Sequence, residues 1–90
     1  MGKASSSQDI QELYHLLSGI SDPEVMKNLL EDLCTSKEIA NISKRIRAAK
    51  LLMEGKTYAQ VIEQTEISSA TLSRVSRCVQ CGKGYSELLK

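Results

Sequence analysis

The chain has 90 residues, of which 41% are hydrophobic, but it contains no Trp, no Phe and only three Tyr. A chain of this length forms one domain with a small aliphatic core, and a dimer would enlarge the buried surface. No apolar run approaches the roughly 20 residues that cross a bilayer, and the first eight residues do not form a signal peptide. We therefore expect a cytoplasmic protein without a membrane partner. The three cysteines, an odd number, favour free thiols over a disulfide framework.

The two parts of the chain carry opposite charge. Residues 1–36 contain two Lys against six Asp and Glu, a net charge of −4, whereas residues 37–83 contain nine Lys and Arg against four Glu, a net charge of +5. A basic segment indicates an anionic partner such as nucleic acid, although an ordinary solvated surface is the alternative.

Two short helices are predicted in the acidic part. The first covers about residues 8–18 and is ended by Gly19 in the left-handed conformation. Ser21 then caps a second helix, with Pro23 in its first turn, over about residues 23–34. The residues expected to face inward are Ile10, Leu13, Tyr14 and Leu17 in the first helix and Val25, Met26, Leu29, Leu30 and Leu33 in the second.

The third predicted helix is the longest. Thr35, with Glu38 as its acidic partner, opens it, and Gly55 closes it. Helical spacing predicts an inward face of Ile39, Ile42, Ile46, Ala49, Leu52 and Met53, and a basic face of Lys44, Arg45, Arg47 and Lys50.

Two further helices are predicted within residues 57–79. Thr57 and Gln60 form a capping box for a short helix, and Ser68 or Ser69 caps the next one. Ile67 can plug the corner between them, and the second helix has a buried stripe of Leu72, Val75 and Val79. The tail can form one or two more turns. Because no strand-like alternation occurs, we expect an all-α fold of five to six helices that includes a helix-turn-helix.

The second helix of this pair has a face suited to DNA. Its short hydroxyl and methyl groups let a helix approach base edges, while arginines and N-terminal amides hold phosphates. We expect Ser69, Ala70, Thr71 and Ser73 to face bases, Arg74 and Arg77 to face phosphate or a ligand, and Ser68, Thr57, Tyr58 and Gln60 to complete the interface. The alternative is that Ser and Thr mark only a cap and a solvated face.

These residues carry a family resemblance. The run from Tyr58 to Arg74, which ends in Ala70-Thr71-Leu72-Ser73-Arg74, resembles bacterial helix-turn-helix repressors. Residues 35–74 resemble the tryptophan repressor in Thr35 with its acidic partner and in Lys44-Arg45-Ile46-Arg47 before an aliphatic run closing at Gly55. The compact length and the tail look most like the YerC/YecD-type proteins of that superfamily.

The resemblance implies an intertwined homodimer that binds double-stranded DNA specifically and acts as a repressor. It also implies a division of the single domain. Residues 1–7 would be a flexible N-terminus, 8–55 the dimerisation helices, 57–79 the helix-turn-helix and 82–90 a short C-terminal segment.

The resemblance further places a ligand site at Thr35, Arg45 and Arg74, since two guanidinium groups suit the carboxylate of an amino acid. Val75, however, stands where the repressor has a Gly that leaves space for the indole ring. A branched side chain obstructs that ring, so we expect no tryptophan corepressor and no other cofactor, and a smaller carboxylate ligand or no ligand instead. Glu66 stands near the corner where such motifs often have Gly, so it or a neighbour must take a positive φ.

Other function classes have less support. A helical interaction module within a transcription assembly remains an alternative, as does a thiol- or zinc-responsive sensor through Cys78 and Cys81. A zinc site needs four ligands and only Cys34 and His15 remain to complete one, and no strand precedes the CxxC spacing as in thioredoxins. We expect no metal site, and no enzyme, because no catalytic constellation surrounds His15. The operator, the direction of regulation and any effector stay open.

Overall fold

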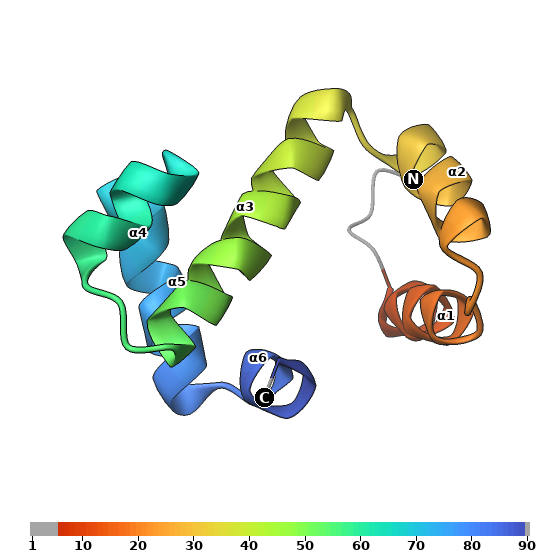
Figure 1. Ribbon diagram of the computed structural model, residues 1–90. Coiled ribbons are helices and arrows are strands. Elements are labelled where there is room, and N and C mark those ends of the chain that lie inside the picture. The colour runs from red at the N-terminus through yellow and green to blue at the C-terminus, as the bar shows by residue number, and fades with distance from the viewer. Residues whose placement is uncertain (1–5, 90) are drawn as a thin grey trace. The chain divides into compact units, whose positions relative to one another are not determined.

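The structure, a computed structural model, describes residues 6–89 and contains six α-helices in that range (Figure 1). They are α1 (Ser7–Ser18), α2 (Pro23–Leu33), α3 (Ser36–Met53), α4 (Tyr58–Thr65), α5 (Ser69–Cys81) and α6 (Gly84–Leu88). The described range has no strand, which confirms the predicted all-α class. None of these helices has the length and apolar character needed to span a membrane. Of the expected flexible residues 1–7, residues 1–5 lie outside the described range, while Ser7 already belongs to α1.

The chain divides into two compact units between Thr35 and Ser36, within the segment expected to hold the dimerisation helices. The first unit contains α1 and α2. Gly19 ends α1 with φ −88°, so the left-handed conformation expected there is wrong. Asp22, and not Ser21, caps α2. The Asp22 carboxylate accepts a 2.9 Å hydrogen bond from the Glu24 N–H, which lies in the first turn of the helix.

The helices of the first unit leave their apolar side chains uncovered. Neither helix contains a fully buried residue. Tyr14 and Leu16 of α1 are 58% and 56% exposed, and Val25 and Leu33 of α2 are 50% and 55% exposed. The inward positions expected for these stripes are therefore at most half-buried in the single chain, because two short helices offer too little apolar surface to enclose each other.

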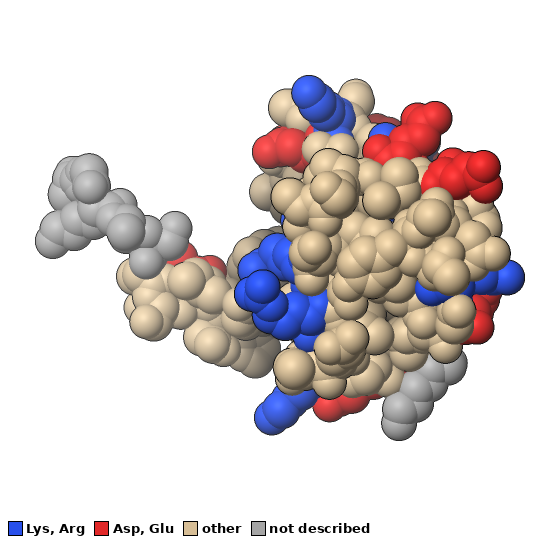
Figure 2. All heavy atoms as spheres, turned by 90° about the vertical axis from the view of Figure 1, so that its left-hand side faces the viewer, with Lys and Arg blue, Asp and Glu red and all other residues tan. Residues whose placement is uncertain are grey.

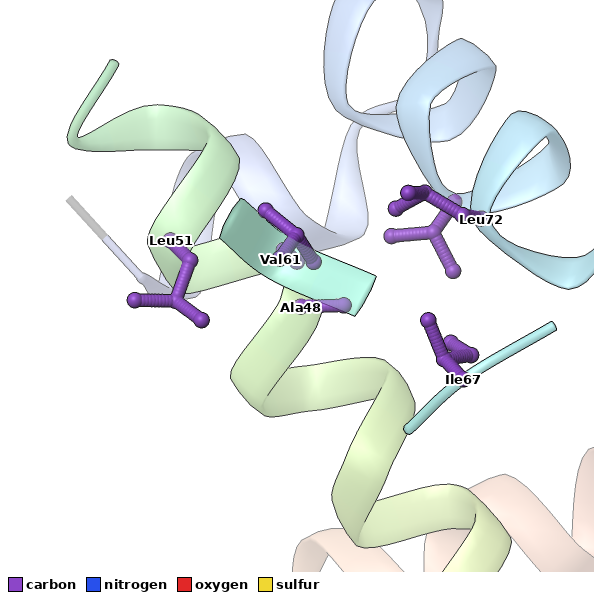
Figure 3. Packing of buried hydrophobic residues seen from close by; sticks show 7 residues of the cluster. Ala48, Leu51, Val61, Ile67 and Leu72 are labelled. Atoms are coloured by element: carbon purple, nitrogen blue, oxygen red, sulfur yellow. The ribbon is translucent and has the colours of Figure 1, made fainter. Parts of the chain in front are cut away.

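The second unit holds the core. The long helix α3 packs against α4 and α5, and α5 packs against α6 (Figure 1). In Figure 3 the side chains of Ala48, Val61, Ile67 and Leu72 gather between α3, α4, the following turn and α5, and Leu51 lies one turn further along α3. The buried cluster consists of Ala48, Ala49 and Leu51 of α3, Val61 of α4, Ile67 of the turn, and Leu72 and Val75 of α5. Two adjacent alanines let the shorter helices approach the α3 backbone closely, because they add almost no side-chain volume.

Only part of the inward face expected for the long helix is buried: Ala49 is fully buried, and Leu52 packs against the core. Ile42 and Ile46 are 43% and 39% exposed, and Met53 is 36% exposed, although all three were predicted to face inward. The buried residues of α3 are Ala48, Ala49 and Leu51, so α4 and α5 cover the side of the helix that carries the two alanines. Beyond its end, Gly55 adopts φ +92°, a conformation that glycine takes without strain.

Candidate nucleic-acid interface

The N-terminus of α4 is held by the predicted capping box. Thr57 Oγ1 accepts a 3.2 Å hydrogen bond from the Gln60 N–H, and Gln60 Oε1 accepts a 2.9 Å hydrogen bond from the Thr57 N–H. Tyr58 follows the cap and is 47% exposed. The three residues that were expected to meet the DNA backbone thus lie together on the surface at one helix end.

The corner of the helix-turn-helix is built from residues 65–67. Glu66 is left-handed, with φ 59° and ψ 25°, and its N–H donates to the Ile62 carbonyl at 2.8 Å. Thr65 Oγ1 donates to the Val61 carbonyl at 2.7 Å and accepts from the Ile67 N–H at 3.3 Å. Ile67 is only 7% exposed. Both expectations for this corner, a positive φ at Glu66 and a buried plug at Ile67, are confirmed.

Ser68, rather than Ser69, caps α5. Its Oγ accepts a 3.1 Å hydrogen bond from the Thr71 N–H and donates to Thr71 Oγ1 at 2.9 Å. Leu72 and Val75, at 0% and 2% exposure, fix which face of the helix is buried. The opposite face presents Ser69, Ala70, Ser73, Arg74 and Arg77 to solvent, with Thr71 half-buried beside them.

Charged side chains lie mainly around the edge of this part of the molecule. Figure 2 views the side on which α4 and α5 lie, and it shows a largely uncharged surface bordered by both basic and acidic residues. A neutral centre lets a helix come close to base edges, whereas cations at the border can reach the phosphates on either side.

A polar hollow of about 240 Å³ lies between the helix-turn-helix and α3. It is lined by Asn41, Lys44 and Arg45 of α3 and by Glu66, Ile67, Ser68 and Thr71 of the corner and α5. Sequence reasoning found the basic face of α3 and placed Glu66 at the corner of the motif, but it did not connect Asn41 and Lys44 with that corner. Helical spacing shows which residues share a face of one helix, but it does not show which other helix that face meets.

Of the three residues expected to hold a carboxylate ligand, Arg45 and Arg74 belong to the second unit. Arg45 lines the polar hollow, whereas the exposed Arg74 is not among the residues that line it. Thr35 is the last residue of the first unit, directly before α3. Val75 is 2% exposed and belongs to the core, so its side chain fills space next to Arg74.

The cysteines are all free thiols. Cys34 and Cys78 are half-buried and Cys81 is exposed. Within residues 6–89 no three His, Cys, Asp or Glu side chains come together in a way that could hold a metal ion.

Comparisons with known proteins agree with this architecture. The Trp repressor protein family matches residues 8–90. YerC, an uncharacterised protein of Bacillus subtilis (strain 168), is 33% identical over 81 residues, which cover 90% of this chain and 78% of YerC.

Two solved structures have the same fold. A candidate Trp repressor from Staphylococcus aureus superposes with a TM-score of 0.86 at 33% identity, covering 93% of this chain and 85% of that one. A TrpR-like protein from Eubacterium eligens ATCC 27750 superposes with a TM-score of 0.85 at 34% identity, covering 92% and 87%. Motif, fold and sequence agree: the chain belongs to the Trp repressor family.

Proposed function

We propose that the protein is a sequence-specific DNA-binding transcription regulator, a repressor, that acts as a homodimer. The observation that carries this proposal is the N-terminal half of α5. Ser69 and Ser73 are exposed, the start of the helix is fixed by the Ser68 cap, and its opposite face is anchored by Leu72 and Val75. A helix held in this way can enter the major groove without rearranging.

The residues of the motif divide into two roles. Ser69, Ala70, Thr71 and Ser73 are small enough to bring the helix close to base edges, and they read the sequence. Arg77 and Arg74 at the outer face, together with Thr57, Tyr58 and Gln60 at the start of α4, hold the phosphate backbone and set the register.

The polar hollow offers a further phosphate contact, in addition to those at the outer face of α5 and at the start of α4. Lys44 and Arg45 flank the Ser68–Thr71 cap, where the N-terminal amides of α5 carry partial positive charge. Glu66 lines the same hollow and opposes an anion there. The net attraction is therefore weaker than two basic side chains alone would provide.

A second copy of the chain is needed to complete the molecule. The exposed apolar side chains of α1 and α2 have no cover within their own unit, and such side chains gathered on two short helices indicate an interface. A two-fold dimer would present two α5 helices to successive major grooves about 34 Å apart.

The proposed repressor works without tryptophan. The resemblance places Val75 at the position that must be open for an indole ring, and its side chain is part of the core. A ligand carboxylate smaller than tryptophan could still meet Arg45 or Arg74, since guanidinium groups bind carboxylates through paired hydrogen bonds.

Selection of bound duplexes from a random pool tests the function, with an Ala70→Glu variant as the probe. Ala70 is exposed in the first turn of α5, so a Glu there stabilises the helix terminus but repels phosphate. We expect an enriched sequence for the original chain and none for Ala70→Glu, at unchanged helix content. Gln80→Glu is the matched control, because it adds the same charge at the other end of α5 and should keep the selected sequence. Equal binding by the two variants would show that α5 does not read DNA and would favour a protein-interaction module.

A further inference from the structure

Two cysteines share the last turn of α5. Cys78 and Cys81 are three residues apart, and the helix ends at Cys81. Cys81 is exposed, whereas Cys78 is half-buried. Cys78 lines an apolar hollow of about 540 Å³ together with Ile46 of α3 and with Tyr85, Leu88 and Leu89 at the C-terminal end. The pair thus has one exposed thiol and one half-buried thiol beside an apolar hollow.

In a regular helix the Cα atoms of the two cysteines are close enough for a disulfide, but their Cβ atoms are too far apart. Residues three apart in an α-helix have Cα atoms about 5 Å apart, within the 4.4–6.8 Å range of disulfides. Their Cβ atoms are about 5–6 Å apart, however, and a disulfide requires about 3.5–4.5 Å. A bond between them therefore forms only if the last turn leaves regular helical geometry. A turn at the very end of a helix can do so, because few hydrogen bonds lie beyond it.

We propose that Cys78 and Cys81 are a redox-sensitive pair that peroxide converts into a disulfide within one helix. Cys81, the exposed thiol, attacks one oxygen of hydrogen peroxide; the O–O bond breaks, Cys81 becomes a sulfenic acid, and one water leaves. Cys78 then attacks the Cys81 sulfur; the S–S bond forms, the S–O bond breaks, and the hydroxyl departs with the Cys78 proton as a second water. Each thiol is oxidised by one electron, and the peroxide is reduced by two.

A disulfide between Cys78 and Cys81 would distort the last turn of α5 and thereby displace the start of α6. The Gly82 N–H donates to the Cys78 carbonyl at 2.8 Å, and a Cβ on Gly82 would lie only 2.6 Å from that oxygen. The backbone after α5 is thus wrapped tightly over Cys78. α6 begins two residues later, at Gly84, and its Tyr85 packs against the core. When the last turn distorts, the start of α6 must move with it.

Peptide mapping tests the bond directly, without relying on DNA binding. Trypsin cleaves after Arg77 and Lys83, so both cysteines fall on one peptide, residues 78–83, while Cys34 falls on residues 28–37. After hydrogen peroxide and then iodoacetamide, we expect peptide 78–83 to be lighter by two hydrogens and unalkylated. A reductant added before iodoacetamide should restore two alkylated cysteines. The strained bond should also be reduced at lower thiol concentration than an unstrained disulfide.

Two variants distinguish a disulfide between Cys78 and Cys81 from the oxidation of other thiols. Cys34→Ser should give the same oxidised peptide, whereas Cys81→Ser should leave Cys78 reactive toward iodoacetamide after the same treatment. Amide NMR spectra should show shifts over residues 78–89 on oxidation and none over residues 57–72. The proposal is overturned if peptide 78–83 keeps two free thiols while Cys34 oxidises. A link between two copies, sulfinic acid without a disulfide, or unchanged α6 resonances would overturn it equally.

Discussion

Glu66 is the one non-glycine residue with a positive φ among residues 6–89, and it forms the corner of the DNA-binding motif. A side chain with a β-carbon is disfavoured in this left-handed conformation, whereas glycine adopts it freely. The Glu66 N–H bond to Ile62 and the buried Ile67 that follows hold the residue there. The corner is therefore locally strained and stabilised by its neighbours.

Replacing Glu66 with Gly should stabilise the protein by about 1 kcal/mol, because the left-handed strain disappears. Urea unfolding followed by circular dichroism measures the change. Glu66→Gln is the control, because it removes the charge but keeps the β-carbon, and its stability should stay close to that of the original chain. Equal stabilisation by Gln and Gly would assign the effect to charge and contradict the backbone explanation.

The expectation that this chain does not bind tryptophan depends on Val75. Since its side chain is 2% exposed, we expect calorimetry to detect no heat of tryptophan binding. Val75→Gly opens the space and should introduce measurable binding, together with a loss of stability from the cavity and from glycine in a helix. Saturable tryptophan binding by the original chain would show that Val75 does not obstruct the ring.

At the scale of the elements, caps and spacings predicted most of what is observed. The Thr57–Gln60 box, the Ser68 cap and the Ile67 plug are all local features, and local sequence determines them. The tertiary choices could not be predicted in the same way. Helical spacing predicted one inward face on α3, but which side of the helix α4 and α5 cover depends on how the helices pack, and they cover the side that carries the two alanines. The polar hollow was missed because it depends on that same choice.

The capping box of α4 can be tested by itself. Thr57→Ala removes the acceptor for the Gln60 N–H, and the loss should lower the free energy of unfolding by about 1 kcal/mol. Ser43→Ala is the control, because Ser43 lies inside α3, where its hydroxyl bonds only to the Ala40 carbonyl one turn earlier. Alanine is favoured at such a position, so stability should stay the same or rise. A loss from Ser43→Ala as large as that from Thr57→Ala would contradict the capping assignment.

At the scale of the whole molecule, the two units of the chain differ in how they are stabilised. The second unit contains the buried core, whereas α1 and α2 contain no buried residue. A segment without a core of its own has to gain its stability from contact with another surface. The proposed dimer supplies that surface, and it explains why an acidic, leucine-rich segment accompanies a basic reading motif.

A single charge on α1 should dissociate the dimer. Leu13 lies on the apolar stripe and is 41% exposed in the single chain. Leu13→Glu would bury a carboxylate in the proposed interface, so sedimentation should report a shift from twice the chain mass toward one chain. Gln8→Glu, on the opposite face of α1, should leave the mass unchanged. A single-chain mass for the unmodified protein would contradict the dimer at once.

The central claim is that a dimer of this chain reads a specific DNA sequence through α5 and holds it through phosphate contacts. Binding to the selected duplex, measured at about 50 and 200 mM salt, tests it most directly. If the protein makes 6 to 10 phosphate contacts, affinity should fall by roughly 10³ to 10⁵ over that range, with two chains bound per duplex. An affinity independent of salt, or the same affinity for a scrambled duplex, would contradict the account.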